Sequence, residues 1–506
     1  EEINKMNKEY TVDVAGTGGT GLAAADAAVS NGLSVIAIEK LDQIVGNTRI
    51  SSGFFAIDTK EQREAGLHLS TQEAIRQLNE YNHYLNNGPL TKRIVENAKP
   101  TLEEVEKLGM GIKLNPTACT TQFAHRGNPY AGGSYHMYQD KEKAYPRIQK
   151  SLENKGVKFL FNTTIQDLIQ AEDGTITGLT AKAENSEDIT IHAKAVVVAT
   201  GGFGGDKKRV DRLMHTDRLR KLGVPSMGEG MNALEKAGGV NIDSHALIHA
   251  AQLAKSKVTQ KTSKKHLAGF SDNPLTRVLL TPLMWVDPDG RRFTNEDTVY
   301  DTVLWANAAY NVGGMYYILV DKATLEAFTN GQEMTVSKAG PGGSTKKGDF
   351  ISLADKAVDD GIAFKGVDLE ELAKNAGFDK ENLLNSVKRY NKAVKFKNDI
   401  EFAKRGINLK FSVEKGPFYA IKAQVAYLGT VGGVRVDDHL RVLDSSFKTI
   451  KGLYAGGANA GGYYEGQSYP AYEGLASGFA WTSGRLAGLA AVEDMRSEVN
   501  KDGSTK

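Results

Sequence analysis

A cluster of glycines near the start of the chain constrains its fold more than any other feature. The run Gly16-Thr17-Gly18-Gly19-Thr20-Gly21 lies between two short apolar runs, residues 12–15 (interrupted by Asp13) and residues 35–38, and Glu39 follows the second. An alanine-rich helical segment separates them. Strand, glycine turn, helix, strand and acid, in this order, predict the first βαβ unit of an α/β, Rossmann-like fold that binds a dinucleotide. The alternative is a glycine-rich turn in another α/β unit.

Each residue of this motif has a physical role in the prediction. Gly16 permits the tight turn, Gly18 lets the backbone approach a pyrophosphate, and Gly21 lets the helix pack against the strand. The free N–H groups and the dipole at the helix N-terminus favour phosphate charge. Glu39, at the end of the second strand, is placed to accept hydrogen bonds from a ribose.

Composition excludes several other classes of protein. The 506 residues predict two or three domains, and a net charge of +2 provides no field for nucleic acid or an anionic membrane. No apolar run approaches the roughly 18 residues of a membrane span. The single cysteine, Cys119, excludes an intrachain disulfide and is interpreted as core filler, and we expect no metal site. The sequence begins at Glu1 without a methionine, as in a trimmed or processed fragment, so cytoplasmic and extracytoplasmic locations both stay open.

Two further segments narrow the choice of dinucleotide cofactor. Residues 46–53 (GNTRISSG) are too polar for a core, and residues 195–205 (AVVVATGGFGG) read as a buried strand running into a glycine turn. With the first motif, they resemble the fumarate reductase flavoprotein superfamily, which includes succinate dehydrogenase flavoproteins, urocanate reductases and 3-ketosteroid dehydrogenases. The resemblance implies FAD. Asn47 stands where members with covalent flavin carry histidine, which implies that the FAD is bound non-covalently.

The resemblance covers nearly the whole chain and implies its domain organisation. A glutathione-reductase-type FAD-binding domain takes residues 1–248 and 431–506, and an inserted α+β capping domain for the substrate takes residues 249–430. A long helix after Glu473 directs its N-terminus at the flavin. The residues expected at the FAD are Gly16, Gly18, Gly19, Thr20, Gly21, Glu39, Lys40, Gly46, Asn47, Thr48, Ser52, Gly53, Ile165, Thr200, Gly201, Gly202, Asn295, Glu296, Gly457, Ala458, Gly474, Leu475 and Ala476.

The substrate positions depart from those of fumarate reductases, which need arginines and histidines for a dicarboxylate. Tyr300 stands where the family's proton-donor arginine follows F-x-N-E, and the carboxylate-clamping arginine near the C-terminus has no counterpart. His249 falls on a substrate-binding histidine. Tyr300 and Tyr469, which precedes a proline, are similar to the 3-ketosteroid dehydrogenase branch. That similarity implies that Tyr300 exchanges a proton with carbon, while Tyr469 and the N–H of Glu473 hold a ketone oxygen, although that branch usually has glycine at the position of Glu473.

These residues predict an FAD-dependent ene-reductase or dehydrogenase acting on an enone, steroid-like or lactone substrate. Hydride from flavin N5 reaches one alkene carbon, and a tyrosine protonates the other. One alternative is a respiratory reductase of an unsaturated carboxylate such as urocanate, an arylacrylate or fumarate, with Arg126, Arg277 or a lysine of the insert as the cation. Another is an electron-transfer subunit without a substrate, in which the tyrosines and His249 are structural residues.

The electron donor is expected to be a separate component. No second nucleotide-binding motif occurs between residues 200 and 430, so direct use of NAD(P)H is not indicated. A reductase, a quinol or an FMN domain could each fill this role. The exact substrate, the direction of the reaction and the oligomeric state stay open.

Overall fold

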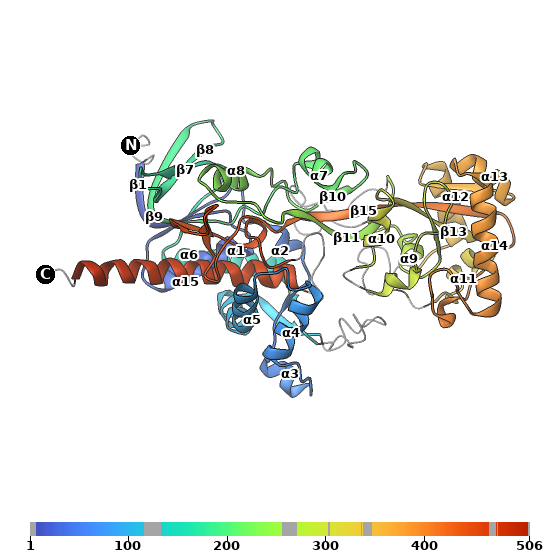
Figure 1. Cartoon of the computed structure of the whole chain (residues 1–506), viewed down its shortest axis with the longest axis horizontal. Coiled ribbons are helices and arrows are strands. Elements are labelled where there is room, and N and C mark those ends of the chain that lie inside the picture. Colours follow the sequence, from blue (N-terminus) through green and yellow to red (C-terminus); the bar gives the residue numbers. More distant parts are fainter. Residues whose placement is uncertain are drawn as a thin grey trace.

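The computed structural model describes residues 7–115, 133–255, 271–301, 304–334, 336, 347–464, 472 and 474–503. These residues form two lobes that meet along one long strand, β15 (Phe418–Val431) (Figure 1). Cys119, Arg126, Tyr469 and Glu473 lie outside the described residues.

The larger sheet carries the predicted βαβ unit. β1 (Asn7–Ala15) pairs in parallel with β2 (Val35–Ile38) and with β9 (Asp188–Val198), and α1 (Gly19–Ser30) makes the crossover. Every residue of β2 is buried, as expected for a strand covered on both faces. The strand order is β16-β17-β9-β1-β2-β6, and the antiparallel pair β7 and β8 joins through β9. The other strands are β6 (Lys158–Leu160), β7 (Thr163–Gln170), β8 (Ile176–Ala183), β16 (Arg441–Leu443) and β17 (Thr449–Ala455).

Helix α15 (Leu475–Gly503) lies along α1 and carries the C-terminal end of the described chain away from the larger sheet (Figure 1). A small three-stranded sheet of β3 (Gly53–Phe55), β4 (Gly111–Leu114) and β5 (Tyr135–Gln139) completes this lobe. Its remaining helices are α2 (Asn47–Ile50), α3 (Lys60–Glu64), α4 (Thr71–Tyr81), α5 (Gly88–Leu108), α6 (Lys141–Lys155), α7 (Lys207–Met214), α8 (Glu229–Lys236) and the 3₁₀ turn η6 (Gly457–Asn459).

The second lobe, called the cap below, is built around β15. This strand pairs antiparallel with β11 (His245–Leu253), β13 (Met315–Asp321) and β14 (Ala363–Gly366), and in parallel with β10 (Arg220–Leu222), while β12 (Met284–Val286) pairs with β13. A second hydrophobic core lies under α13 (Leu369–Ala376) and α14 (Lys380–Phe396). The other cap elements are α9 (Thr276–Leu279), η3 (Glu296–Tyr300), α10 (Asn307–Asn311), α11 (Lys322–Thr329), α12 (Phe350–Asp359) and η5 (Gly406–Asn408).

The α/β prediction with an inserted α+β unit is confirmed by this architecture. The proposed domain boundaries are less sharp than their numbers suggest, because residue 248 falls inside β11 and residue 430 falls inside β15. Both strands belong to the cap sheet, and so does β10 from the first part of the chain. The two lobes therefore share backbone pairing, and the boundaries stay a proposal.

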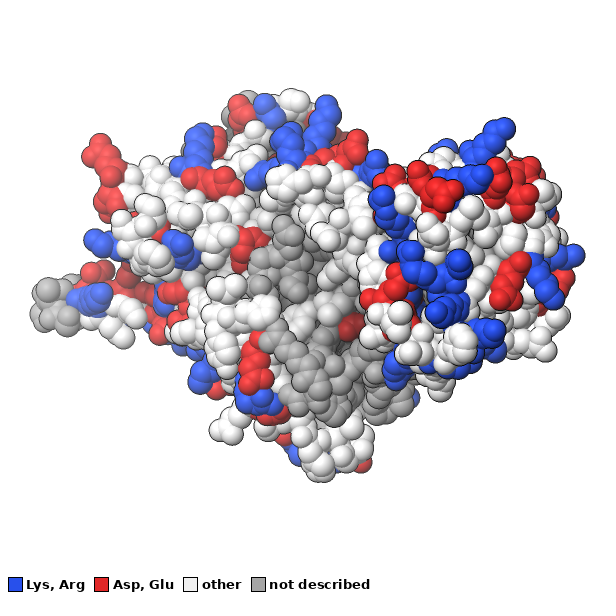
Figure 2. Space-filling view, turned by 45° about the vertical axis from the view of Figure 1, so that its right-hand side comes forward, with Lys and Arg blue, Asp and Glu red and all other residues white. Residues whose placement is uncertain are grey.

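The face of the molecule seen in Figure 2 shows no dominant charge. Basic and acidic side chains are interspersed on both lobes in the view of Figure 2, in line with the net charge of +2. Among the described helices, none is long and apolar enough to cross a membrane.

Candidate active site

A cavity of about 480 Å³ opens at the carboxyl ends of β1, β2 and β9. The segments that line it include the glycine turn, the loop after β2, the segment around α2, the loop after β9 and the first turn of α15, and residues of β5, β7, β11 and β15 also contribute. Ligands of open α/β sheets bind at this edge, where the loops that follow the parallel strands converge. The loops of the larger sheet therefore form one side of the site, and the cap strands β11 and β15 contribute to its wall.

The glycine turn adopts the geometry that its sequence predicts. Gly16 has a φ of +104°, and a Cβ there would lie 2.2 Å from the carbonyl oxygen of Ala199. Gly21 does not line the cavity, because it supports the turn from behind: a Cβ there would lie 1.8 Å from the carbonyl oxygen of Gly16. The two glycines let the N-terminus of α1 open onto the cavity.

Glu39 lies at the cavity with its carboxylate already held by the chain. One oxygen accepts hydrogen bonds from the N–H (3.0 Å) and the hydroxyl (2.7 Å) of Thr17, and the other accepts from the N–H of Leu41 (2.9 Å). Burial raises the pKa of Glu39, and these hydrogen bonds oppose the rise. An ionised carboxylate has about four acceptor sites, so this fixed group can still receive ribose hydroxyls.

The α2 segment connects the glycine turn to the cap. The hydroxyl of Thr48 accepts a hydrogen bond from the N–H of Gly19 (3.1 Å). The Asn47 amide donates to the carbonyl of Leu428 in β15 (3.1 Å) and accepts from the N–H of Val224 (3.1 Å). Asn47 therefore holds one wall of the cavity against the strand that both lobes share.

Most of the predicted cofactor residues line this cavity. Leu475 and Gly202 do not, although their chain neighbours Ala476 and Gly201 do. Their roles in binding the cofactor stay predictions. The predicted residues at the cavity are Gly16, Gly18, Gly19, Thr20, Glu39, Lys40, Gly46, Asn47, Thr48, Ser52, Gly53, Ile165, Thr200, Gly201, Gly457, Ala458, Gly474 and Ala476.

Asn295 and Glu296, which are also predicted at the cofactor, do not line the cavity in this structure. Glu296 is fully buried in the cap, where its carboxylate pairs with Arg292 (2.7 Å) and Lys404 (3.5 Å). Arg292 also pairs with Asp399 (2.8 Å). Asn295 caps η3 by accepting from the N–H of Asp297 (2.9 Å). Both residues therefore stabilise the cap.

Of the four predicted catalytic residues, His249 is the one that the structure places at the cavity. Tyr300 ends η3 in the cap, and it does not line the cavity in this arrangement of the lobes. Burial and, to a smaller extent, the nearby Asp297 raise the pKa of Tyr300 to about 12, against the opposing effect of Arg405. Tyr469 and Glu473 lie outside the described residues.

Positive charge is scarce at the described cavity wall. Lys40 is the only lysine or arginine among the described lining residues, and its ammonium group pairs with Glu229 and donates to the carbonyl of Pro225 (3.1 Å). Arg277, a candidate cation for a carboxylate substrate, does not line the cavity and lies 3.5 Å from Glu333. Arg126 lies outside the described residues.

Several lining residues were not among the predicted site residues. Tyr135 and Met137 alternate along β5 and face the cavity, and Tyr464 follows a glycine pair at its edge. The period-two pattern of β5 was a usable signal for the first two. Ser51 and Ser477 also line the cavity, but single serines carry no sequence signal of that role.

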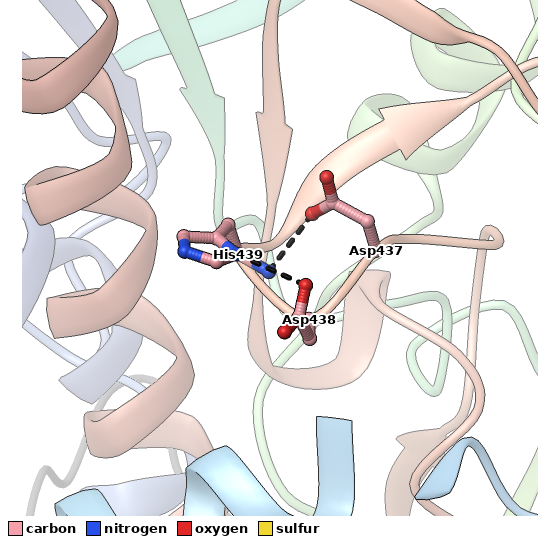
Figure 3. Close-up of side chains that lie close together, drawn as sticks. All are labelled: Asp437, Asp438 and His439. Carbon is pink, nitrogen blue, oxygen red and sulfur yellow. Dashed lines mark hydrogen bonds and ion pairs between the residues drawn. The ribbon is translucent and has the colours of Figure 1, made fainter. Parts of the chain in front are cut away.

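One group of side chains outside the cavity has the donor types of a metal site. Asp437, Asp438 and His439 lie close together (Figure 3), and the described residues contain no other such group. Asp437 accepts from the N–H groups of His439 (2.9 Å) and Arg441 (3.0 Å), and His439 Nδ1 is 3.0 Å from Asp438. These contacts hold a tight turn, so the group is explained without an ion.

The cavity fits the predicted cofactor. The N-terminus of α1, which lines the cavity, suits a pyrophosphate, the buried carboxylate of Glu39 suits a ribose, and the first turn of α15 supplies a second positive helix end. The glycine at position 16 keeps this approach open, since a side chain there would collide with Ala199. These features come from the loops that the sequence motifs predicted.

Comparison with known proteins agrees with this geometry. Residues 11–470 match the model of the FAD binding domain family. The vinyl phenol reductase of Lactiplantibacillus plantarum is 28% identical over 498 residues, covering 96% of this chain and 96% of that protein. The NADH:fumarate oxidoreductase of Klebsiella pneumoniae is 27% identical over 91% of this chain, but this chain covers only 45% of that protein.

Solved structures share the fold. The 3-ketosteroid Δ1-dehydrogenase from Sterolibacterium denitrificans, in complex with 1,4-androstadiene-3,17-dione, superposes with a TM-score of 0.72 at 20% identity, covering 96% of this chain and all of that chain. The open conformation of a flavocytochrome c3 fumarate reductase superposes with a TM-score of 0.64 at 22% identity, covering 97% of this chain and 80% of that chain.

Proposed function

Because this chain belongs to the FAD binding domain family and is an FAD-dependent oxidoreductase acting on CH–CH bonds, we propose that its substrate is an uncharged molecule with an activated C=C bond. Enones, lactones and steroid-like ketones are the class that the sequence favours. The vinyl phenol in the name of the Lactiplantibacillus plantarum relative also has no carboxylate. Reduction and the reverse dehydrogenation use the same groups.

The observation that carries this proposal is the scarcity of cations at the cavity. Lys40 is the sole described lysine or arginine there, and Glu229 already neutralises it. A dicarboxylate needs charged, usually arginine, partners when it leaves water. An uncharged alkene needs an apolar wall and a few donors, and Leu247, Tyr464 and Phe479 supply such a wall.

Bound FAD supplies the hydride for one alkene carbon. The chain supplies the proton for the other carbon, and the proposed donor is Tyr300. With a pKa of about 12, its phenol keeps the proton at neutral pH until a carbanion-like carbon accepts it. Tyr469 and the N–H of Glu473 are the proposed donors to the carbonyl oxygen. The proposal requires the cap to approach the cavity, since Tyr300 does not line it in this arrangement.

Anaerobic reoxidation of the reduced enzyme tests the substrate class. We expect fast reoxidation by a 3-keto-Δ4 steroid, another enone or a vinyl phenol, and slow or no reoxidation by fumarate and urocanate. Replacing Tyr300 by Phe should then lower the rate by about 10²–10⁴-fold, the usual contribution of a positioned acid. Fast turnover of fumarate with none of the uncharged alkenes would contradict the proposal.

The second candidate is a reductase of an unsaturated carboxylate, favoured by His249 at the cavity and by the relatives named for fumarate and urocanate. Arg126 or Arg277 would then supply the cation. Replacing Arg277 by Ala decides part of this question, because only a carboxylate reductase would lose turnover through it. The electron donor remains a proposal: a separate reductase, quinol or FMN domain.

A further inference from the structure

Three basic residues lie close together on neighbouring segments at β15, the strand that both lobes share. Lys422 lies in β15, Lys255 follows β11, and Arg218 precedes β10. The N–H of Ala254 donates to the carbonyl of Lys422 (2.9 Å), and the side chain of Gln424 donates to the carbonyl of Arg218 (2.7 Å). Arg218 and Lys255 are exposed, and Lys422 is half-buried. We call these three basic residues the cationic surface.

The charges of the cationic surface repel one another. Burial, Lys255 and Arg218 all lower the pKa of Lys422, because the neighbouring positive charges disfavour its ammonium form. None of the three residues makes an ion pair among the described residues. An anion placed over them would relieve this repulsion.

The nearby acidic residues do not neutralise the cationic surface. A Cβ on Gly361 would lie 3.5 Å from Lys255 Nζ, but the adjacent Asp360 pairs with Lys356 (3.0 Å). Residues 256–270, which lie outside the described chain, contain no aspartate or glutamate. The positive charge is therefore a local excess, although the whole chain is nearly neutral.

The excess continues along α7 and β10. Residues 207–221 contain seven lysines and arginines but only two acids, whereas the whole chain has 63 and 61. Lys208 and Arg212 are both exposed and lie one turn apart on α7. Like charges at this spacing destabilise a helix. Folding does not require this concentration of charge, so we look for its purpose in binding.

This surface begins at the rim of the cavity. The ammonium group of Lys221, in β10, donates to the carbonyl of Gly205 in the loop after β9 (3.2 Å). Residues 224–226, directly after β10, line the cavity, and so does Leu428 of β15. A partner that covers the cationic surface and β10 therefore lies beside the predicted cofactor.

We propose that the cationic surface, with the adjoining α7 and β10, docks the acidic face of the protein that supplies electrons to the bound FAD. The proposal rests on the proposed function only in requiring a separate electron donor, and it is independent of the substrate class. An uncharged quinol would gain nothing from these cations. An acidic protein would be steered to them, because complementary charges raise the association rate.

The first test measures binding of poly-L-glutamate to the full chain by fluorescence anisotropy at low ionic strength. We expect the double variant Arg218→Glu/Lys255→Glu to bind at least about tenfold more weakly than the wild type. The control Lys374→Glu/Lys388→Glu changes the net charge by the same amount at exposed positions of α13 and α14 and should bind like the wild type. Equal loss in both variants, or no loss in either, would overturn the proposal.

The second test measures reduction of the bound FAD by reduced flavodoxin, an acidic protein that serves as the probe of the donor. Two flavodoxin hydroquinones each lose one electron and become semiquinones, and the FAD takes up both electrons and a proton from solvent. The rate should fall steeply with added salt, and Arg218→Glu/Lys255→Glu should be about tenfold slower at low salt. No reduction of the wild type, or equal rates in both proteins, would overturn the assignment to the electron donor.

Three controls separate the alternatives. Photoreduced deazariboflavin, a small uncharged reductant, should reduce the FAD of all variants at the same rate. Single-stranded RNA and phosphatidylserine vesicles should bind more weakly than polyglutamate, and tighter binding of either through the same residues would overturn the assignment to a protein. Loss of all alkene turnover with polyglutamate binding intact would instead count against the proposed function and leave the surface assignment standing.

Discussion

At the scale of single residues, Asp13 is a buried carboxylic acid in a strand of the larger sheet. It lies near the C-terminal end of β1 with no exposed surface, and neither carboxylate oxygen has a hydrogen-bond partner. Burial raises its pKa from 3.8 to about 9. The apolar runs on both sides predicted the strand correctly despite this residue. The native state therefore holds a neutral carboxylic acid where the strand pattern calls for an apolar side chain.

This burial predicts a pH dependence of stability. The folded chain keeps a proton at Asp13 that the unfolded chain releases above its ordinary pKa of 3.8. Its contribution to the free energy of unfolding is therefore present at low pH and falls as pH rises toward 9, by at most about 1.4 kcal/mol per pH unit. Urea titrations of the wild type and Asp13→Asn between pH 5 and pH 8 measure the effect. This range covers about three pH units, so the expected change in the free energy of unfolding is at most about three times the change per unit.

Only the difference between these two proteins reports Asp13, because other groups titrate in the same range. We expect the free energy of unfolding of Asp13→Asn to rise relative to that of the wild type as pH rises. Parallel pH profiles would mean that the carboxyl group is not buried in the way described.

At the scale of elements, the contact of α1 with α15 couples the glycine turn to the end of the chain. A Cβ on Gly484 would lie 2.1 Å from the carbonyl oxygen of Thr20, and one on Gly488 would lie 2.5 Å from that of Ala24. Thr20 itself lines the cavity. The backbone of α15 therefore rests directly on the first turns of the helix that faces the predicted pyrophosphate.

Gly484→Ala tests this coupling. The added methyl group collides with backbone and has to displace α1, so we expect a loss of about 1–3 kcal/mol of stability. We also expect weaker FAD binding, since the turn of α1 would move. Thermal unfolding and FAD titration measure the two effects. Gly503→Ala on the same helix has open space around it and should change neither. Equal behaviour of the two variants would contradict the described packing.

The elements that could be predicted from sequence are those fixed by local pattern. β1, α1 and β2 follow from apolar runs around a glycine turn, and α15 begins two residues from the predicted helix start at Glu473. The role of Glu296 could not be predicted in this way. Glu296 pairs with Lys404, and the neighbouring Arg292 pairs with Asp399. Both partners lie about a hundred residues further along the chain, and a motif match gives a residue's position in the sequence but not its contacts. The hydrogen bond between Tyr138 and Ser477 joins segments over 300 residues apart, so no local sequence pattern indicates it.

At the scale of the whole molecule, the cap has its own interior and its own buried charges. Arg292, Glu296, Asp399 and Lys404 are all nearly free of solvent and pair with one another. Breaking a buried pair by removing one partner costs about 3–5 kcal/mol, because the other charge stays behind. None of the four lines the cavity. Stability of the cap and affinity for FAD should therefore respond separately to mutation.

Glu296→Gln tests this separation and the predicted place of Glu296 at the cofactor. We expect a lower melting temperature, from a loss of about 3 kcal/mol or more, with an unchanged dissociation constant for FAD measured well below the transition. Glu401→Gln removes the partner of Arg389 in a more exposed pair of the same lobe and should cost less than about 1 kcal/mol. A tenfold weaker FAD affinity in a folded Glu296→Gln protein would instead support the prediction that this residue contacts the cofactor.

Strand β15 has a consequence for how such a cap can be inherited or exchanged. Cutting the chain at residues 248 and 430 would leave β10 with the host and remove β15, the strand with which it pairs. The same cuts would divide β11 between donor and host. A chimaera that is meant to transfer the specificity of one cap to another FAD-binding lobe therefore has to transfer β10, β11 and β15 together. The segment that must be exchanged is larger than the inserted one.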